Sequence, residues 1–323
     1  MRLFRTACVA MLALGLQLAG AAAQEFPQRP IRLVIPYPAG GTTDVIARAL
    51  QEPLRASLGQ SIVIENRGGG AGAIAMREVV NAAPDGYSLV ISNNGPTTLL
   101  PLLRPDIGYG AAGALAPVSL LSTTPLILTV STGLPATDLA QFFGYLKAHP
   151  DRLSYGTAGV GSYGHVATLL MTQMAGVQAV HVPYRGQAPM TLALIAGEVQ
   201  FVLTTHSQAM AEQVEAGRLR RLGVSTAEPS PLVPGAPPIE TALPGFVAEV
   251  WFGLLAPSAT PPAVVARLNG AVQQALALPA VRQQLRGAGM VAQGGTPEAF
   301  GQRLQRDAEL WQGIVRSADI RPD

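Results

Sequence analysis

The sequence predicts an α/β protein of two lobes that are joined by two crossings of the chain. Short apolar, β-branched runs alternate with longer segments of helical periodicity, which is the pattern of mostly parallel sheets covered by helices. The alternation runs through two series, the second beginning near Pro125, and a long apolar strand and a helical tail follow. A chain of 323 residues, 48% hydrophobic and 13% charged, is long enough for two domains with cores of their own.

The first series is bounded by glycine and proline signals. Gly40, Gly41 and Thr42 turn the chain from a strand into a helix, and Gly59 ends that helix. The run Pro84-Asp85-Gly86-Tyr87 is typical of a turn before a strand. The predicted elements are, in order, strand 31–36, helix 43–58, strand 61–65, helix 71–82 and strand 88–92.

The second series repeats this scheme and leads into the tail. Its predicted strands are 126–130, 153–156, 179–182, 199–203 and 219–225, and its predicted helices are 138–148, 163–175, 189–196 and 208–216. The proline-rich stretch 229–238 is predicted to be a surface connection before a long strand at 247–256. Prolines at the first helical position then start helices 261–276, 279–286 and 297–318.

The order of these elements predicts how the chain is divided between the lobes. Residues 24–123 and 250–323 are expected to form the first lobe, and residues 124–249 the second. The chain then crosses twice between the lobes, and we expect both crossings to act as hinges. A small-molecule site is expected between the lobes, outside the carboxyl ends of the strands.

Residues 1–23 have the features of a secretory signal peptide. Arg2 and Arg5 precede an apolar run that is too short to span a membrane, and Ala21-Ala22-Ala23 supplies small residues for signal peptidase. We predict cleavage after Ala23 and a periplasmic mature protein. The mature chain is cysteine-free, because Cys8 lies in the signal, and it has 20 basic and 20 acidic residues. This balance predicts no nucleic-acid partner, and we expect a monomer.

Two glycine-rich loops, each between a strand and a helix, are candidate anion-binding sites. In the first, Pro38-Ala39-Gly40-Gly41-Thr42-Thr43-Asp44, the glycines allow backbone N–H groups to converge at the positive end of a helix. Ordinary capping of that helix by Thr42, with no ligand, is the alternative. The candidate ligand-binding residues of this loop are Tyr37, Ala39, Gly40, Gly41, Thr42 and Thr43.

The second loop runs from Thr157 to His165 and belongs to the other lobe. Two facing loops would hold a carboxylate from both sides and favour lobe closure. Arg185 either neutralises a carboxylate or is a solvated surface residue, and Trp251 and Phe252 either form the floor of the cleft or belong to the core. The candidates here are Thr157, Ala158, Gly159, Gly161, Ser162 and His165, and Asn93, Tyr184, Arg185, Thr204 and Thr205 complete the predicted site.

The motifs favour a binding protein over an enzyme. The glycine run from Gly68 to Ala73 lacks the downstream acid of a dinucleotide fingerprint, and the histidines lack metal-ligand spacing, so no cofactor and no metal are predicted. A secreted hydrolase or isomerase that uses Ser162 and His165 is the alternative function. Against it, Val160 stands where a nucleophile elbow needs glycine.

A series of sequence blocks extends over essentially the whole mature chain, and in this order it resembles the Bug family of tripartite tricarboxylate transporter receptors. The resemblance implies a type II-like periplasmic binding protein, a Venus flytrap that captures a carboxylate through main-chain donors of the two loops, partly through ordered waters, without turnover. The blocks are Arg29-Pro30-Ile31-Arg32, the loop from Pro38 to Asp44, Val63 to Arg67, Ala83 to Tyr87, Tyr155 to Gly161, His181 to Gly186, and Trp251 to Pro257.

The resemblance also implies a class of ligands and partners. Family ligands include di- and tricarboxylates, acidic amino acids, aromatic acids and nicotinate-like compounds, and the partners are membrane transporter subunits or a sensing system. The chain departs from its family at two places: Leu203-Thr204-Thr205-His206 replaces the common Phe-Asp-Asn, and Gly68 to Gly72 replaces Pro-Gly-Ala-Gly-Gly. The first departure lies in a loop that is expected to face the cleft, so the resemblance does not transfer the identity of the ligand.

Overall fold

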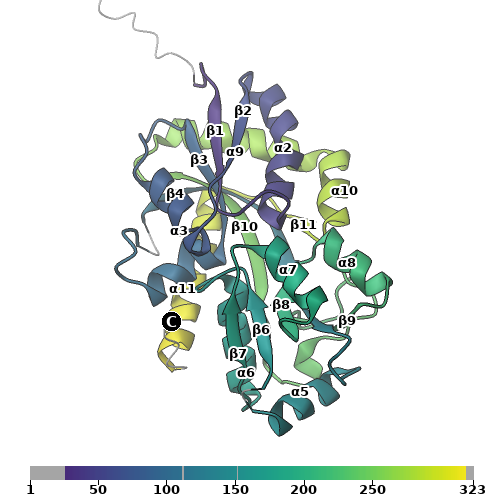
Figure 1. The fold of residues 1–323 in the computed structure, drawn as a ribbon. Helices are drawn as coiled ribbons and strands as arrows, with labels where there is room; N and C mark the ends of the chain where they lie inside the picture. Colours follow the sequence, from purple (N-terminus) through teal and green to yellow (C-terminus); the bar gives the residue numbers. More distant parts are fainter. Residues whose placement is uncertain (1–25, 111–112, 151, 318–323) are drawn as a thin grey trace, which may run out of the picture.

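The computed structural model describes residues 26–110, 113–150 and 152–317, and it shows two lobes, each built around one sheet (Figure 1). The first lobe, in the upper half of Figure 1, contains a six-stranded sheet in the order β11-β4-β10-β3-β1-β2. The second lobe contains a five-stranded sheet in the order β7-β6-β8-β5-β9. The predicted signal peptide, residues 1–23, lies outside the described residues, as does the last residue of the predicted helix 297–318.

The first sheet has a parallel half and an antiparallel half. β1 (Ile31–Ile35) pairs in parallel with β2 (Ile62–Asn66) and with β3 (Ser88–Asn93). β10 (Glu249–Pro257) runs antiparallel to β3 and to β4 (Leu115–Pro125), and the short β11 (Val291–Ala292) pairs with β4 at the edge. The expectation of mostly parallel sheets is therefore wrong, because β10 returns from the second lobe in the opposite direction.

Helices cover both faces of the first sheet, as the alternation of side chains in β1 shows. Leu33 and Ile35 pack in one core cluster with residues of α2 and α9, whereas Val34 packs in another with residues of α3 and with Phe300 of α11. Gly59 ends the first of these helices in the left-handed conformation, as predicted. The helices of this lobe are α2 (Thr42–Leu58), α3 (Ala73–Val80), α4 (Leu100–Leu103), α9 (Pro262–Ala277), α10 (Pro279–Gly287) and α11 (Pro297–Ser317).

The second sheet is also mixed. Within it β6 runs parallel to β7 and β8, and β5 runs antiparallel to β8 and β9. The stretch 229–238 is not wholly at the surface, because Val233 and Ala236 are buried against β5 and β9. The elements are β5 (Ile127–Ser131), α5 (Leu139–Ala148), β6 (Ser154–Thr157), α6 (Tyr163–Met174), β7 (Val180–Pro183), α7 (Gln187–Ala196), β8 (Phe201–Thr204), α8 (Gln208–Glu215) and β9 (Leu219–Val224).

The longest strand, β4, is the main element that the sequence analysis did not assign. It contains Pro117 and Pro125, and proline within a run argues against a strand because it cannot donate to the ladder. The structure accommodates Pro117 opposite Leu255, next to an irregularity in the pairing of β4 with β10. The π-helical turn Gly95–Leu99 and α4, which precede this strand, were also unassigned.

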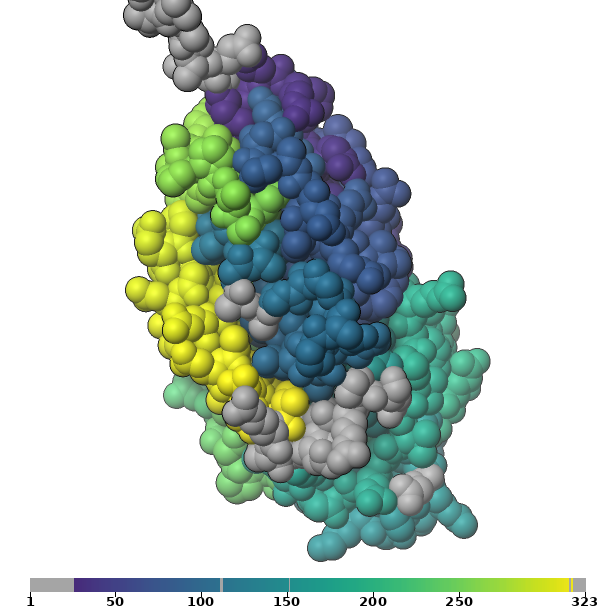
Figure 2. All heavy atoms as spheres, turned by 90° about the vertical axis from the view of Figure 1, so that its left-hand side faces the viewer, coloured from purple at the N-terminus to yellow at the C-terminus, as the bar shows by residue number. Residues whose placement is uncertain are grey.

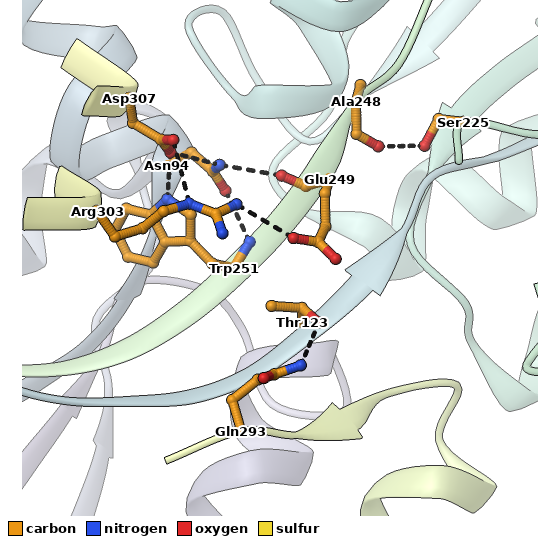
Figure 3. A network of polar contacts seen from close by, with 9 residues as sticks. All are labelled: Asn94, Thr123, Ser225, Ala248, Glu249, Trp251, Gln293, Arg303 and Asp307. Atoms are coloured by element: carbon orange, nitrogen blue, oxygen red, sulfur yellow. Dashed lines mark hydrogen bonds and ion pairs between the residues drawn. The ribbon is translucent and has the colours of Figure 1, made fainter. Parts of the chain in front are cut away.

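The two crossings between the lobes lie side by side and are bonded to each other. Only Leu126 separates β4 from β5, and the chain returns through Ala248 into β10. The buried hydroxyl of Ser225 accepts a hydrogen bond from the Leu126 N–H at 2.8 Å and donates one to the Ala248 carbonyl (Figure 3). The predicted lobe limits fall near these points, inside β4 and at the start of β10, and the division at 123/124 and 249/250 stays a prediction.

The C-terminal helix α11 belongs to the first lobe but reaches the second. Figure 2 shows it in yellow, running down the side of the first lobe to the neighbourhood of the second. At its far end the Trp311 ring meets the Tyr163 ring of α6 edge-on, with centroids 5.3 Å apart. None of the described helices combines the length and apolar character needed to cross a membrane.

A cluster of charges on the first sheet makes folding stability depend on pH. Glu65 on β2 accepts hydrogen bonds from Arg32 at 3.0 Å and Arg67 at 2.9 Å. The Arg32 hydrogen bonds, reinforced by Arg67 and opposed by partial burial, lower the pKa of Glu65 to about 2 from 4.5. The depressed pKa means that the ionised form stabilises the fold above pH 4.5, and that this stabilisation is lost as the pH falls toward 2.

We therefore expect Glu65→Gln to lower the free energy of unfolding at pH 7 by about 1 kcal/mol, a value discounted because the cluster is partly exposed to solvent. The difference between wild type and variant should shrink as the pH falls through 4.5 and vanish near 2. Urea titrations at a series of pH values measure it. A difference that stays constant with pH would show that the carboxylate charge is not responsible.

Candidate functional site

The lobes enclose a cavity with about 700 Å³ of empty space, part of it open to solvent. The cavity lies between the loop after β1, the carboxyl ends of β6 and β8, the start of α7, and the two crossings. The predicted site residues that line it are Tyr37, Ala39, Gly41, Thr42, Thr43, Asn93, Thr157, Ala158, Ser162, Thr204 and Thr205.

Other predicted residues do not reach this lining, and several lining residues were not predicted. Phe252 lines the cavity, in agreement with its interpretation as floor, whereas Trp251 is fully buried in the core. Ligands of α/β proteins bind outside the carboxyl ends of parallel strands. Gln187 follows such a strand, so this rule could have predicted it. The predicted residues outside the lining are Gly40, Gly159, Gly161, His165, Tyr184 and Arg185, and the missed ones are Pro38, Leu126, Tyr163, Gly164, Gln187, Ala188, Met190, Leu203 and Val250.

The N-terminus of α2 opens into the cavity. Gly41, not Thr42, is the N-cap residue, and no side chain caps the helix. The first N–H groups of a helix have no partner within it, and the helix dipole makes this end positive. Because Gly41, Thr42 and Thr43 all line the cavity, the backbone presents a set of donors suited to an anion.

Asp44 accounts for the different position of Gly40. Its buried carboxylate accepts hydrogen bonds from the Gly40 N–H at 3.0 Å, from Arg48 Nε at 2.8 Å and from Asn66 Nδ2 at 3.2 Å. Burial raises the pKa of Asp44, but these hydrogen bonds and the Arg48 charge outweigh it and lower the pKa overall. The Gly40 N–H is therefore used to hold the loop, and the left-handed φ of 85° at Gly40 gives the turn its shape.

The second predicted loop, from Thr157 to His165, has more hydrogen bonds within itself than the first. Ser162 caps α6 by accepting from the His165 N–H, and the Gly161 N–H donates to His165 Nδ1 at 3.2 Å. The Gly159 N–H lies 3.2 Å from Thr157 Oγ1. These two donors are bonded within the loop, whereas Thr157, Ala158 and Ser162 of the same loop line the cavity, and the second anion cradle stays a prediction.

The glycines of the second loop allow close approach to the first lobe. A Cβ on Gly159 would lie 3.4 Å from the Cβ of Ala71, and one on Gly161 would lie 2.3 Å from Leu100 Cδ1. A Cβ on Gly95, in the first lobe, would lie 2.9 Å from the Tyr163 nitrogen. The structure is therefore closed, with the second loop packed on the first lobe beside the cavity.

A polar contact across the cavity also joins the lobes. Thr42 Oγ1, at the start of α2, lies 2.8 Å from Thr205 Oγ1 in the loop after β8. Gln187 Nε2 donates to the Thr205 carbonyl at 2.7 Å, and Gln187 Oε1 accepts from Thr42 Oγ1 at 3.4 Å. Thr205 belongs to the segment that departs from the family pattern, so this contact depends on the residue that this chain has there.

The cavity is lined by neutral groups. Among the described residues that line it there is no aspartate, glutamate, lysine, arginine or histidine. Burial of the phenol raises the pKa of Tyr37 to about 12, although a hydrogen bond with Asn93 lowers it. Burial also raises the pKa of Tyr163. Arg185 is exposed and lies outside the lining, so an anion in the cavity would be held by backbone and neutral donors.

The sequence pattern of the tripartite tricarboxylate transporter family receptor matches residues 46–319. The chain belongs to this receptor family. It is 32% identical to Protein BugT of Bordetella pertussis over 322 residues, which cover 98% of each chain. The resemblance to the Bug family is thereby confirmed.

Solved structures of similar proteins have the same two-lobe fold. Rpa4515 of R. palustris with adipate superposes with a TM-score of 0.87 at 34% identity, covering 93% of this chain and 100% of that one. MatC from Rhodopseudomonas palustris with bound malate gives 0.84 at 33% identity, covering 90% and 100%. The predicted fold class is confirmed, and the chain is a periplasmic solute-binding receptor of the Bug type.

In this receptor Ser162 and His165, the residues of the alternative enzymatic hypothesis, make contacts within the second loop. Ser162 Oγ contacts the backbone N–H of His165, at 3.4 Å, and His165 Nδ1 accepts the Gly161 N–H. The His165 ring stacks on His181 at 4.1 Å, and His181 Nε2 lies 2.7 Å from Thr157 Oγ1.

Proposed function

We propose that the receptor binds a small organic acid by placing a carboxylate at the N-terminus of α2 and closing its lobes over it. The observation that carries the proposal is the uncapped end of this 17-residue helix, which opens into the cavity between the lobes. Charge-assisted hydrogen bonds contribute about 1.5 to 3 kcal/mol each, so two or three of them suffice for micromolar affinity after the cost of association.

The relatives support a carboxylate as the ligand class, because Rpa4515 is described with adipate and MatC with malate. We extend the proposal to the cellular role. The receptor is exported by its signal peptide, cleaved after Ala23, acts as a monomer without enzymatic activity, and delivers the acid to the membrane subunits of a tripartite transporter. Val160, which stands where a nucleophile elbow needs glycine, favours this role over a hydrolase that uses Ser162 and His165.

Gly41 provides the test of the carboxylate position. Its backbone is extended, with φ −81° and ψ 170°, and the nearest atom to an added Cβ would be the Pro38 carbonyl oxygen at 3.6 Å. Alanine therefore fits without strain. Aspartate is a good N-cap residue, so its carboxylate would take the donors that the ligand needs and repel the ligand's charge.

We expect Gly41→Asp to weaken binding at least about 30-fold, which corresponds to about 2 kcal/mol for one lost charge-assisted hydrogen bond. Gly41→Ala should stay within about fivefold of wild type, and the melting temperature of the ligand-free protein should change little in both. Calorimetric titration with hexanoate, benzoate, adipate and malate, together with thermal melts, measures this. A folded Gly41→Asp protein with unchanged affinity would place the carboxylate elsewhere.

A further inference from the structure

We propose that the preferred ligand has a single carboxylate and an apolar body, such as an aliphatic or aromatic monocarboxylic acid, rather than the di- or tricarboxylate of the family name. This inference rests on the proposed function, because it assumes that one carboxylate lies at α2. It concerns what the rest of the cavity can accept. Three features of the described lining support it. Its floor and one wall are apolar, several of its polar side chains are already hydrogen-bonded within the protein, and it lacks cations.

The floor and far wall of the cavity are apolar. Leu126 comes from the first crossing, Val250 and Phe252 come from β10, and together they form the floor. Met190 of α7 and Leu203 of β8 form the wall on the second lobe. Each of these five side chains is at most 4% exposed in the closed structure. A ligand body enclosed against them is removed from water, which favours carbon and hydrogen over charge.

Four polar side chains that line the cavity from the second lobe already have partners within the protein. Thr205 and Gln187 bond to each other and to Thr42, Thr157 Oγ1 contacts His181, and Ser162 caps α6. A second carboxylate that bound to these four side chains would have to displace their bonds, some of which hold the closed state. The α2 donors lie on the first lobe and serve the first carboxylate.

The described lining also lacks any cation that could neutralise a second negative charge. Burial of an unpaired carboxylate is costly, and it is tolerated only with a counter-charge or several donors. A second carboxylate could avoid burial at the mouth of the cavity, where Pro38, Ala39 and Ala188 are both exposed and part of the lining. The experiment therefore includes a variant at the mouth.

The test compares hexanoate with adipate, which has the same six-carbon chain and a second carboxylate, by calorimetric titration of the purified mature receptor. We expect hexanoate, or benzoate as an aromatic equivalent, to bind at least tenfold more tightly than adipate. Equal or tighter binding of adipate, or binding of malate or citrate alone, would overturn the inference. If adipate binds and Gly41→Asp abolishes it, the proposed function stands and only this inference falls. If no acid binds at millimolar concentration, both fall.

A gain of function provides the second arm. Ala188→Arg places a guanidinium at the mouth, and we expect it to raise the affinity for adipate relative to hexanoate at least fivefold. Leu192→Arg is the matched control, because Leu192 lies one turn further along α7, is 68% exposed and does not line the cavity. It should leave the ratio unchanged. If the affinity for adipate relative to hexanoate changed equally in both variants, or changed in neither, the lack of a cation would not be the cause of the selectivity.

Discussion

Replacing Asp307 with alanine should lower the free energy of unfolding by about 3 kcal/mol, the largest loss of stability that we expect from a single polar side chain here. Asp307 lies on α11 and is 7% exposed. Its carboxylate accepts hydrogen bonds from the Trp251 indole N–H, from Asn94 Nδ2 at 3.2 Å and from Arg303 Nε at 3.3 Å (Figure 3). The network ties the C-terminal helix to the strand that returns from the second lobe.

The cost arises from the groups that alanine would leave behind. The Trp251 side chain is fully buried, so its N–H would have neither an acceptor nor water, and a buried unsatisfied donor costs about 1 to 3 kcal/mol. Arg303 would keep Glu249 at 3.1 Å but lose its second anion. Asn94 would keep its bonds to the Glu249 carbonyl and the Trp251 backbone N–H.

Two variants serve as controls in urea denaturation at pH 7. Asp307→Asn retains an oxygen for the indole N–H, so it should lose only about 1 kcal/mol. Asp106→Ala breaks an exposed ion pair with Arg104 and should leave the unfolding midpoint nearly unchanged. If Asp307→Ala were no less stable than Asp106→Ala, the network would not hold α11 in place.

Local signals in the sequence were sufficient for most of the fold. Glycines and prolines at element ends marked α2 and the C-terminal helices, because they act through the backbone of a few neighbouring residues. The strand β4 escaped prediction because Pro117 is tolerated only through its place beside an irregularity in the pairing with β10. That partner lies more than 120 residues away in the chain, so no local pattern contains the information.

Local patterns in the sequence also predicted part of the site. The loop before α2 combines a strand, two glycines and a helix start, and this local pattern led to Gly41, Thr42 and Thr43. The second loop has the same pattern, but there the glycines serve contact between the lobes, and glycine needed for an anion looks the same in sequence as glycine needed for packing. Phe252 and Met190 reach the cavity only through tertiary folding.

That packing role leads to a prediction about closure. Gly161→Ala should weaken ligand binding between about 5- and 150-fold, because overpacking of a tight contact costs about 1 to 3 kcal/mol. The added Cβ would lie 2.3 Å from Leu100 Cδ1, across the boundary between the lobes. This clash exists only when the lobes are closed. A ligand that binds the closed state must then overcome it, so affinity falls while the open receptor stays folded.

Gly161 also has a left-handed φ of 77°, which strains any alanine at that position in both states. Gly176→Ala separates the two effects, because its φ is 63° and nothing lies within 4 Å of the added Cβ. It should lower the melting temperature but leave the affinity unchanged. The double variant Gly161→Ala with Leu100→Ala should recover binding, since the remaining Leu100 Cβ lies 3.6 Å away, an ordinary contact. Titration of the four proteins with the acid that wild type binds best, and small-angle scattering with and without it, decide the matter. If Gly161→Ala binds as tightly as Gly176→Ala, the contact with Leu100 does not limit closure.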